Sequence, residues 1–422
     1  MNDQIVVGMD IGTTKVCAVV AESDELGKIN VLGIGLAESD GLNRGVVVNI
    51  DKTVASVQKA IHEAERAADV EVQNVIVGIA GDHIQSFQSR GVITIANPEI
   101  SESDVRRLID DTTHVAMPPD REILHLIPQE FIVDGQDGVL DPVGMHGVRL
   151  EANVHIITGL ISAAKNIYRC IQKAGYQVTD VVLEPLASSF SVLHPDEKEV
   201  GVALIDIGGG TTDVAVFEDR TIRHTAVIAV AGNNVTEDIR KGLGIMRNQA
   251  EQLKCQFGCA TVDLTDGDEH IQIPGLGGRQ EITISTSTLS QIIEARMREI
   301  LEIAHIEIRR SGYGKHLSAG AVLTGGGSMI RGTQELANEI LGLETRIGSP
   351  TERGSGLWQE VSDPKFATGA GLVLYGLDPK MAGSVPQDRM GKYLSGMGGS
   401  NEKRDSSWGK LVGRMKGWFD EL

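Results

Sequence analysis

Residues 202–217 read VALIDIGGGTTDVAVF, and this stretch is the most informative about the fold. Two apolar runs flank a turn of glycine, threonine and aspartate, which predicts a β-hairpin with a glycine-rich tip. Residues 5–20 read IVVGMDIGTTKVCAVV and repeat the pattern. Two copies of one strand–turn–strand unit indicate a duplicated architecture. We therefore expect two related lobes, each opened by one hairpin, with a polyphosphate ligand between them.

The residues of the two turns suit phosphate and a metal ion. Glycines let backbone N–H groups approach an anion closely, and consecutive turn amides form a concave anion site. Threonine hydroxyls add donors, and Lys15 supplies a positive charge. Asp10 and Asp206 end the first strand of each hairpin and offer oxygen ligands for Mg²⁺, directly or through water. An ordinary hairpin with a solvated tip explains either copy alone, but it explains the matched pair less well.

Composition limits the class of protein. The chain has 422 residues, of which 41% are hydrophobic, so we expect two or three domains with a sizeable core. The net charge of −19 argues against nucleic acid as the main partner. The N-terminus lacks a basic segment, and no stretch approaches the ~20 apolar residues of a spanning helix. We expect no signal peptide and a cytosolic body.

The rest of the body predicts α/β layers with one insertion. Apolar residues at helical spacing predict a helix over 51–69, and a short apolar run predicts a buried strand over 74–79. Between residues 83 and 162 the pattern changes to alternating strands around a helix over 101–117, for which Ser101 is a suitable N-cap. We interpret this segment as a small α+β insertion within the first lobe.

Three further places supply candidate site residues. Glu184 is either an acidic residue at a helix start or a carboxylate that orients water at a γ-phosphate. Glu251 and Lys254 share one helix face, as a surface ion pair or as two polar groups facing a ribose. Residues 325–327 are three glycines after a strand, where a flat base or ribose can pack against bare backbone.

The last residues form a separate unit. Residues 379–406 are rich in Gly, Ser, Pro and charge, which predicts a flexible linker. Residues 407–422 predict an amphipathic helix whose apolar residues fall within an arc of roughly 120°. These residues are Trp408, Leu411, Val412, Met415, Trp418, Phe419 and Leu422. Aromatic residues opposite Lys and Arg are typical of a helix at a membrane surface, although a helix docked on the body has a similar stripe.

These motifs resemble the actin-like ATPase superfamily. Within it, the chain resembles the FtsA family of bacterial cell-division proteins nearly end to end. The most particular matches lie in the insertion, in addition to the terminal helix. They are PVGMHGVRLE at 142–151, VHI at 154–156, GDHI at 81–84 and IPQE at 127–130.

The resemblance implies an α/β, actin-like two-lobe fold, with duplicated mixed-sheet lobes around a nucleotide cleft, an α+β insertion and a C-terminal amphipathic helix. It divides the chain into four subdomains ahead of the linker and the helix. These are the first lobe, IA, at 1–82, 163–199 and 363–378; the insertion, IC, at 83–162; the second lobe, IIA, at 200–242 and 317–362; and its upper subdomain, IIB, at 243–316.

The resemblance also implies ATP and Mg²⁺ in the cleft, with Asp10 and Asp206 at the metal. Glu184 matches the acid that positions water in filament-forming relatives. The implied binding residues are Asp10, Gly12, Thr13, Thr14 and Lys15; Asp206, Gly208, Gly209, Gly210, Thr211, Thr212 and Asp213; Gly232; Glu251 and Lys254 near the ribose; and Gly325, Gly326 and Gly327 on the adenosine side.

The implied function is a structural one in cell division. Such a protein polymerises on the cytoplasmic face of the inner membrane at the division site. It binds the C-terminal peptide of the tubulin-like FtsZ through subdomain IIB, lipid through the terminal helix, and later division proteins through the insertion. The residues do not decide whether ATP is hydrolysed at an appreciable rate.

Two alternative functions remain. A pilus-assembly actin-like adaptor shares the fold and the insertion but not the tail. A sugar-type kinase needs a catalytic Asp beside a hydroxyl-binding pocket, and no segment of the sequence stands out as one.

Overall fold

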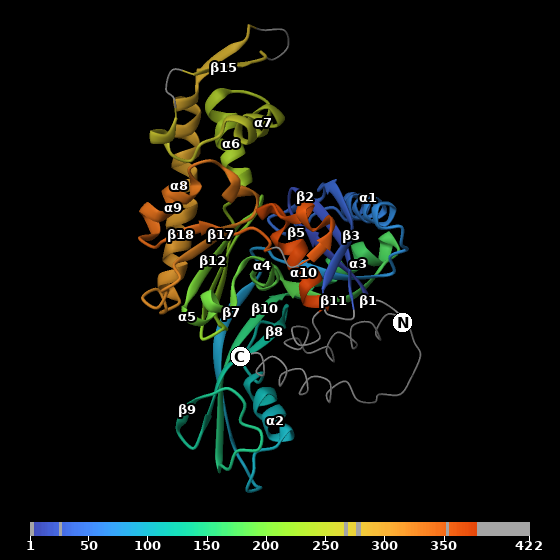
Figure 1. Cartoon of the computed structure of the whole chain (residues 1–422), viewed down its shortest axis with the longest axis vertical. Helices are drawn as coiled ribbons and strands as arrows, with labels where there is room; N and C mark the ends of the chain where they lie inside the picture. Colours follow the sequence, from blue (N-terminus) through green and yellow to red (C-terminus); the bar gives the residue numbers. More distant parts are fainter. Residues whose placement is uncertain (1–3, 25–27, 266–268, 276–279, 352–353, 378–422) are drawn as a thin grey trace.

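The computed structural model describes residues 4–24, 28–265, 269–275, 280–351 and 354–377. Two mixed sheets, each part of one lobe, form the centre of the molecule (Figure 1). The predicted linker and terminal helix lie outside the described residues.

The first sheet has the strand order β11-β6-β1-β2-β3-β19. Its strands are β1 (Gln4–Ile11), β2 (Lys15–Ser23), β3 (Ile29–Glu38), β6 (Asn74–Ile79), β11 (Gln177–Leu183) and β19 (Gly354–Gly356). The second sheet has the order β14-β13-β12-β17-β18. Its strands are β12 (Val202–Ile207), β13 (Thr212–Glu218), β14 (Thr221–Ile228), β17 (Ala321–Thr324) and β18 (Thr345–Ile347).

The two sheets repeat one topology. In the first, β1 pairs antiparallel with β2 and parallel with β6; in the second, β12 pairs antiparallel with β13 and parallel with β17. The order β3-β2-β1-β6-β11 therefore matches β14-β13-β12-β17-β18 strand for strand. The predicted duplication is confirmed, and each glycine-rich hairpin opens one sheet.

Helices cover both sheets and fill the space between them. In the first lobe, α1 (Ile50–Ala68) packs on β3 and on α3 (Ile161–Ala174). The helix α4 (Glu184–Val192) contacts strands of both sheets and packs against α10 (Ala367–Leu377), so these two helices join the lobes. Three helices lie on the second lobe and above it: α6 (Gly232–Leu243), α8 (Thr286–Arg310) and α9 (Thr333–Leu341).

Short elements complete the two lobes. They are the helices α5 (Pro195–Val200) and α7 (Arg247–Phe257), the hairpin of β4 (Leu42–Asn43) and β5 (Val46–Val47), and the hairpin of β15 (His270–Ile273) and β16 (Ile282–Ser285). The β15–β16 hairpin and α7 lie at the upper end of the molecule in Figure 1. No helix of the described ranges is long and apolar enough to span a membrane.

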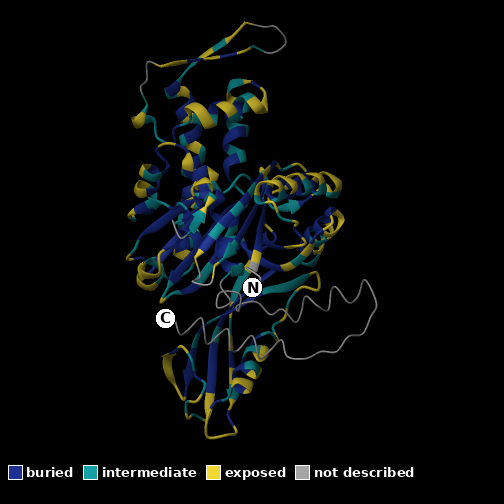
Figure 2. Ribbon diagram, turned by 45° about the vertical axis from the view of Figure 1, so that its right-hand side comes forward, coloured by how far each residue is buried: buried dark blue, intermediate teal, exposed yellow. Residues whose placement is uncertain are grey.

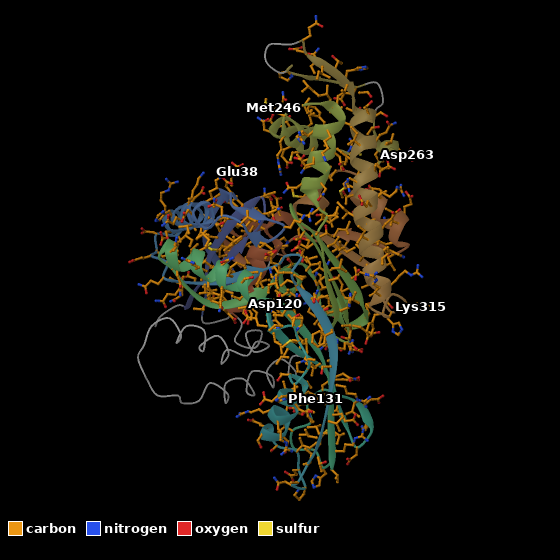
Figure 3. The ribbon with its side chains drawn as sticks, turned by 180° about the vertical axis from the view of Figure 1, so that it is seen from behind. Glu38, Asp120, Phe131, Met246, Asp263 and Lys315 are labelled. Atoms are coloured by element: carbon orange, nitrogen blue, oxygen red, sulfur yellow. The ribbon has the colours of Figure 1, made fainter. Side chains whose placement is uncertain are left out.

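The insertion is a separate layer of sheet and helix. Its sheet has the order β7-β10-β8-β9, formed by β7 (Gln85–Thr94), β8 (Arg121–Val133), β9 (Gln136–Val139) and β10 (Arg149–Leu160). The helix α2 (Glu102–Thr112) packs on β7. Figure 3 places Phe131 in this sheet and Met246 at the opposite end of the molecule.

The expected cap of α2 is confirmed, but the expected end is wrong. The Ser101 side chain accepts from the Asp104 N–H, and the Asp104 side chain accepts from the Ser101 N–H, which forms a capping box. The helix ends at Thr112 rather than at Met117. Two prolines follow, at Pro118 and Pro119, and a residue before proline avoids the α conformation.

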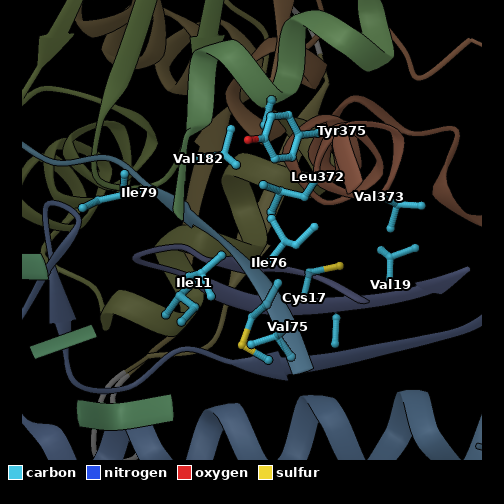
Figure 4. Close-up of a cluster of buried hydrophobic side chains, with 14 of the residues drawn as sticks. Ile11, Cys17, Val19, Val75, Ile76, Ile79, Val182, Leu372, Val373 and Tyr375 are labelled. Carbon is cyan, nitrogen blue, oxygen red and sulfur yellow. The ribbon is translucent and has the colours of Figure 1, made fainter. Parts of the chain in front are cut away.

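Buried side chains form three clusters, one for each lobe and one for the insertion (Figure 2). Beneath the first hairpin, Cys17 and Val19 of β2 face Leu372, Val373 and other residues of α10 (Figure 4). The second face of the second sheet packs into the same cluster through residues such as Leu204. One continuous hydrophobic core therefore packs against both hairpins.

Candidate functional site

A cavity of about 800 Å³ lies between the two lobes and is lined by the turns of both hairpins. Seventeen of the eighteen implied binding residues line it, and so does Glu184. The glycine turn after β17, with η3 at Gly326–Met329, and the helix α7 form further parts of its wall. The structure thus brings together residues that are up to about 300 positions apart in the chain.

The two turns have the same backbone geometry. In the first, the Gly12 N–H donates to the Lys15 carbonyl at 3.0 Å. In the second, the Gly208 N–H donates to the Thr211 carbonyl at 2.9 Å. Gly208 therefore corresponds to Gly12 in position as well as in sequence.

The turns approach each other so closely that only glycine fits on one side. A Cβ atom at Gly209 would lie 2.3 Å from Cγ2 of Thr14, and one at Gly210 would lie 2.2 Å from Oγ1 of Thr13. Real Cβ atoms do not make contacts under 3.0 Å. The glycines of the second turn thus let the two tips meet across the cleft.

Four carboxyl groups gather at the bottom of the cavity: Asp10, Glu184, Asp206 and Asp213. Asp206 and Asp213 are directly opposite each other in the β12–β13 pair. Burial raises the pKa of Asp206 to about 6, the hydrogen bond from Ser188 at 2.8 Å opposes this, and Asp10 adds to it. Burial and neighbouring carboxylates hold the pKa values of Asp213 and Glu184 well above their usual range.

Lys15 partly balances this negative charge. Its Nζ lies 2.5 Å from Oδ2 of Asp10. Burial alone would lower the pKa of Lys15, but Asp10, Cys17 and Glu184 together outweigh this effect and the pKa lies above its usual value. Lys15 is therefore held as a cation at the phosphate side of the cavity.

The carboxyl groups fit a metal held partly through water. Oδ1 of Asp213 is buried and has no hydrogen-bond partner among the described residues. Within the same residues, no group of three His, Cys, Asp or Glu side chains is placed to hold an ion directly. A hydrated cation relieves repulsion between carboxylates without needing three direct ligands, which is how Mg²⁺ is commonly bound.

The opposite wall is built by α6 and α7. Nζ of Lys254 lies 2.8 Å from Oε2 of Glu251 and donates to Oγ1 of Thr236 at 3.0 Å and to the Gly232 carbonyl at 3.3 Å. Burial would raise the pKa of Glu251, but Lys254 together with hydrogen bonds from Thr236 and Cys255 outweighs it, and the pKa is lowered. The pair is thus an ion pair and also a polar surface of the cavity.

The third glycine turn packs tightly on the second hairpin. Gly325 has φ +80°, and a Cβ there would lie 2.3 Å from Oδ1 of Asp206. Both the backbone conformation and the close contact therefore require glycine at this position. A Cβ at Gly326 would meet nothing within 4 Å. This turn therefore offers bare backbone to the cavity at a fixed distance from Asp206.

Thr212 is the residue that the structure does not bring to the cavity. It is fully buried, and its hydroxyl donates to the Val230 carbonyl at 2.8 Å. Thr211 and Asp213 line the cavity, and successive side chains of a strand point to opposite faces, so Thr212 points away. Thr212 was expected in the binding motif, and its side chain is not among those that line the cavity.

Sequence reasoning missed several residues of the cavity. Gly45 lines it, and its N–H donates to Oγ1 of Thr13 at 3.1 Å. Lys365, in a short 3-10 segment at Pro364–Phe366, and Thr368, in the first turn of α10, also line it, about 150 residues after the second hairpin. The dipeptide Pro364–Lys365 before a helix was a weak local signal, and nothing local identified Gly45.

Comparisons with known proteins agree over the whole chain. The family model for Cell division protein FtsA matches residues 203–371, and the model for the SHS2 domain inserted in FtsA matches residues 81–158. Cell division protein FtsA of Pseudomonas aeruginosa is 43% identical over 417 residues, which cover 99% of this chain and 98% of the relative. Cell division protein FtsA of Escherichia coli K12 is 37% identical over 412 residues, 96% of this chain and 97% of the relative.

Solved structures show the same fold at low sequence identity. A PilM–PilN type IV pilus biogenesis complex has a TM-score of 0.64 at 16% identity and covers 90% of this chain and 100% of that chain. MreB5 of Spiroplasma citri bound to ADP has a TM-score of 0.54 at 16% identity and covers 88% of this chain and 96% of that chain. With the curated relatives above, these likenesses confirm the expected architecture: the chain has an actin-like fold and belongs to the FtsA family of cell-division proteins.

Proposed function

We propose that this cell-division protein binds ATP with Mg²⁺ in the cavity between its lobes and acts as a membrane-bound scaffold. The observation that carries the nucleotide part is the pair of identical turns that meet across one cavity, beside Lys15 and four carboxyl groups. The solved MreB5 structures bound to ADP and to AMPPNP share the fold and support this proposal.

Each part of the nucleotide has a place in the proposal. The backbone amides and hydroxyls of residues 12–15 and 208–211 bind the phosphates, together with Lys15. Asp10 and Asp206 hold Mg²⁺ through water, and the ion supplies neutralisation of the phosphate charge. Glu251 and Lys254 face the ribose, and residues 325–327 face the base.

Glu184 is proposed to orient a water at the terminal phosphate. Its side chain lies over Gly78, as a methyl of Thr368 does: a Cβ at Gly78 would be 3.1 Å from Cγ of Glu184 and 3.4 Å from that methyl. A raised pKa makes the ionised form of this carboxylate a stronger base toward water than an exposed glutamate. This geometry suits slow hydrolysis, and it equally suits a state in which ATP only closes the lobes.

The cellular part of the proposal rests on the family and on the sequence of the tail. The protein assembles into filaments on the cytoplasmic face of the inner membrane at the division site. The C-terminal peptide of FtsZ binds to subdomain IIB, and later division proteins bind to the insertion. The residues of 407–422 place an apolar face with two tryptophans opposite Lys and Arg, which suits insertion at the level of the lipid headgroups.

The experiment is co-sedimentation with anionic liposomes, using the full chain and a chain stopped after Asp405, each with and without ATP–Mg²⁺. We expect only the full chain to sediment, and more of it with ATP–Mg²⁺, because filaments gather many weak helices. Equal sedimentation of both chains, or of neither, would contradict the membrane part of the proposal.

The two alternatives have less support. The pilus-assembly complex shares only the fold at 16% identity, whereas the relatives at 37–43% identity are cell-division proteins. A sugar-type kinase remains testable, because it would phosphorylate a polyol above background when supplied with ATP–Mg²⁺.

A further inference from the structure

One strand of the insertion contacts both lobes at buried hydrogen bonds. On β8, His125 meets the first lobe and Gln129 meets the second. Nε2 of Gln129 donates to the carbonyls of Ile222 at 2.9 Å and Arg223 at 3.1 Å in β14. Gln129 lies at a bulge of β8, between Pro128 and Glu130, and its amide bonds the second lobe while His125 bonds the first, so β8 spans the joint between the lobes.

The contact of His125 lies directly beside the cavity. The backbone N–H of Leu183 donates to Nε2 of His125 at 3.0 Å, and His125 is fully buried. Leu183 is the N-cap residue of α4, and Glu184 follows as its first residue. Because Nε2 accepts, the proton of the neutral ring is on Nδ1, and burial lowers the pKa of His125 to about 4, which keeps the ring neutral.

The bond to His125 lies where β11 ends and α4 begins. No side chain caps α4, and Leu183 itself has no polar side chain. One turn later, Ser188 donates to Oδ2 of Asp206 at 2.8 Å, so the helix also carries a partner of the second hairpin. A shift of the first turn would therefore move Glu184 against a fixed Asp206.

We propose that His125 is a positioning residue: through the N–H of Leu183 it fixes Glu184 toward the terminal phosphate of a bound nucleotide, and it thereby links the insertion to the cleft. This inference rests on the proposed nucleotide site. It assigns a role in the cleft to a residue of the insertion that does not line the cavity.

The test measures the preference for ATP over ADP, which depends on what faces the terminal phosphate. Competition against MANT-ADP, with Mg²⁺ present, gives both dissociation constants for each full-length variant. His125→Leu removes the acceptor, and His125→Gln keeps an oxygen near the place of Nε2. His155→Leu is the matched control, because His155 is as deeply buried in the insertion but bonds Thr225 of the second lobe at 3.0 Å.

We expect His125→Leu to lower the preference for ATP roughly threefold to tenfold, the range for one lost hydrogen bond. His125→Gln should restore it, and His155→Leu should leave it unchanged. In a Glu184→Gln background, His125→Leu should have no further effect. If His125→Leu does not fold, His125→Asn replaces it, because its shorter amide cannot reach the Leu183 N–H.

Three results would overturn the inference: no change in the preference with His125→Leu, the same change in both backgrounds, or an equal change with His155→Leu. These results are distinct from a failure of the proposed function. In that case the unmodified chain binds neither ATP nor ADP, and the role of His125 fails with it.

Discussion

Replacing Asp206 by Asn should make the nucleotide-free protein more stable and its nucleotide binding weaker. Asp206 is 9% exposed and lies among three other carboxyl groups, which share the cavity with Lys15. Asn has the same shape and removes the charge, and its side-chain oxygen still accepts from Ser188, which lies 2.8 Å away. The substitution therefore removes a buried charge, and its repulsion by Asp10, without opening a cavity.

The size of the effect follows from the pKa of Asp206. A rise of this pKa from the usual 3.8 to about 6 means that the ionised carboxylate costs the folded state about 3 kcal/mol at pH 7. Because the folded state holds the proton more tightly, the wild type loses this stability as pH rises from about 4 through 6. The advantage of Asp206→Asn should thus be largest at pH 7, about half as large at pH 5, and under about 1 kcal/mol at pH 4.

Urea denaturation of both proteins at these three pH values, without nucleotide or Mg²⁺, measures the difference. In parallel, calorimetry should show that Asp206→Asn weakens binding of ATP–Mg²⁺ at least about tenfold. Lower stability of the Asn variant at pH 7, or a difference that does not change with pH, would refute the reasoning about the carboxyl cluster.

Two other substitutions test the packing around the site. Gly325→Ala should destabilise the fold by about 1–3 kcal/mol in thermal denaturation and weaken nucleotide binding, because φ is +80° and the new Cβ would strike Asp206. Gly326→Ala, which meets nothing within 4 Å, should change stability by less than about 0.5 kcal/mol, and equal effects would refute the clash. Gln129→Leu should cost about 1–3 kcal/mol in urea denaturation, because it leaves buried carbonyls of β14 without its amide, whereas the exposed Gln136→Leu should be neutral. Equal stability of the two Gln variants would contradict the role of β8 as a joint.

The hairpins and their duplication could be predicted from sequence because their signals are local. Each hairpin places an Asp, a glycine turn and threonines within a few residues of two apolar strands, and the structure has both where expected. The capping box at Ser101 is equally local. Helix α1, expected at 51–69, is observed at Ile50–Ala68.

Contacts between distant segments could not be predicted in this way. The strand β19 consists of Gly354–Gly356 and has no apolar pattern; it exists because it pairs with β3, more than 300 residues earlier. Similarly, His125 has no motif, and its partner Leu183 is 58 residues away. Thr212 is a different case, because strand alternation after the turn already indicates that its side chain points away from those of Thr211 and Asp213.

The most direct test of the central claim is calorimetric titration of the chain with ATP in the presence of Mg²⁺. Lys15 is the cation beside Asp10 in the first turn, whereas Lys52 forms an exposed ion pair with Asp40 and serves as the control. We expect the unmodified chain and Lys52→Ala to bind one ATP with equal affinity. Lys15→Ala should bind ATP at least about tenfold more weakly. Unchanged affinity of Lys15→Ala, or no binding by the unmodified chain, would contradict the assignment of the cavity as a nucleotide site.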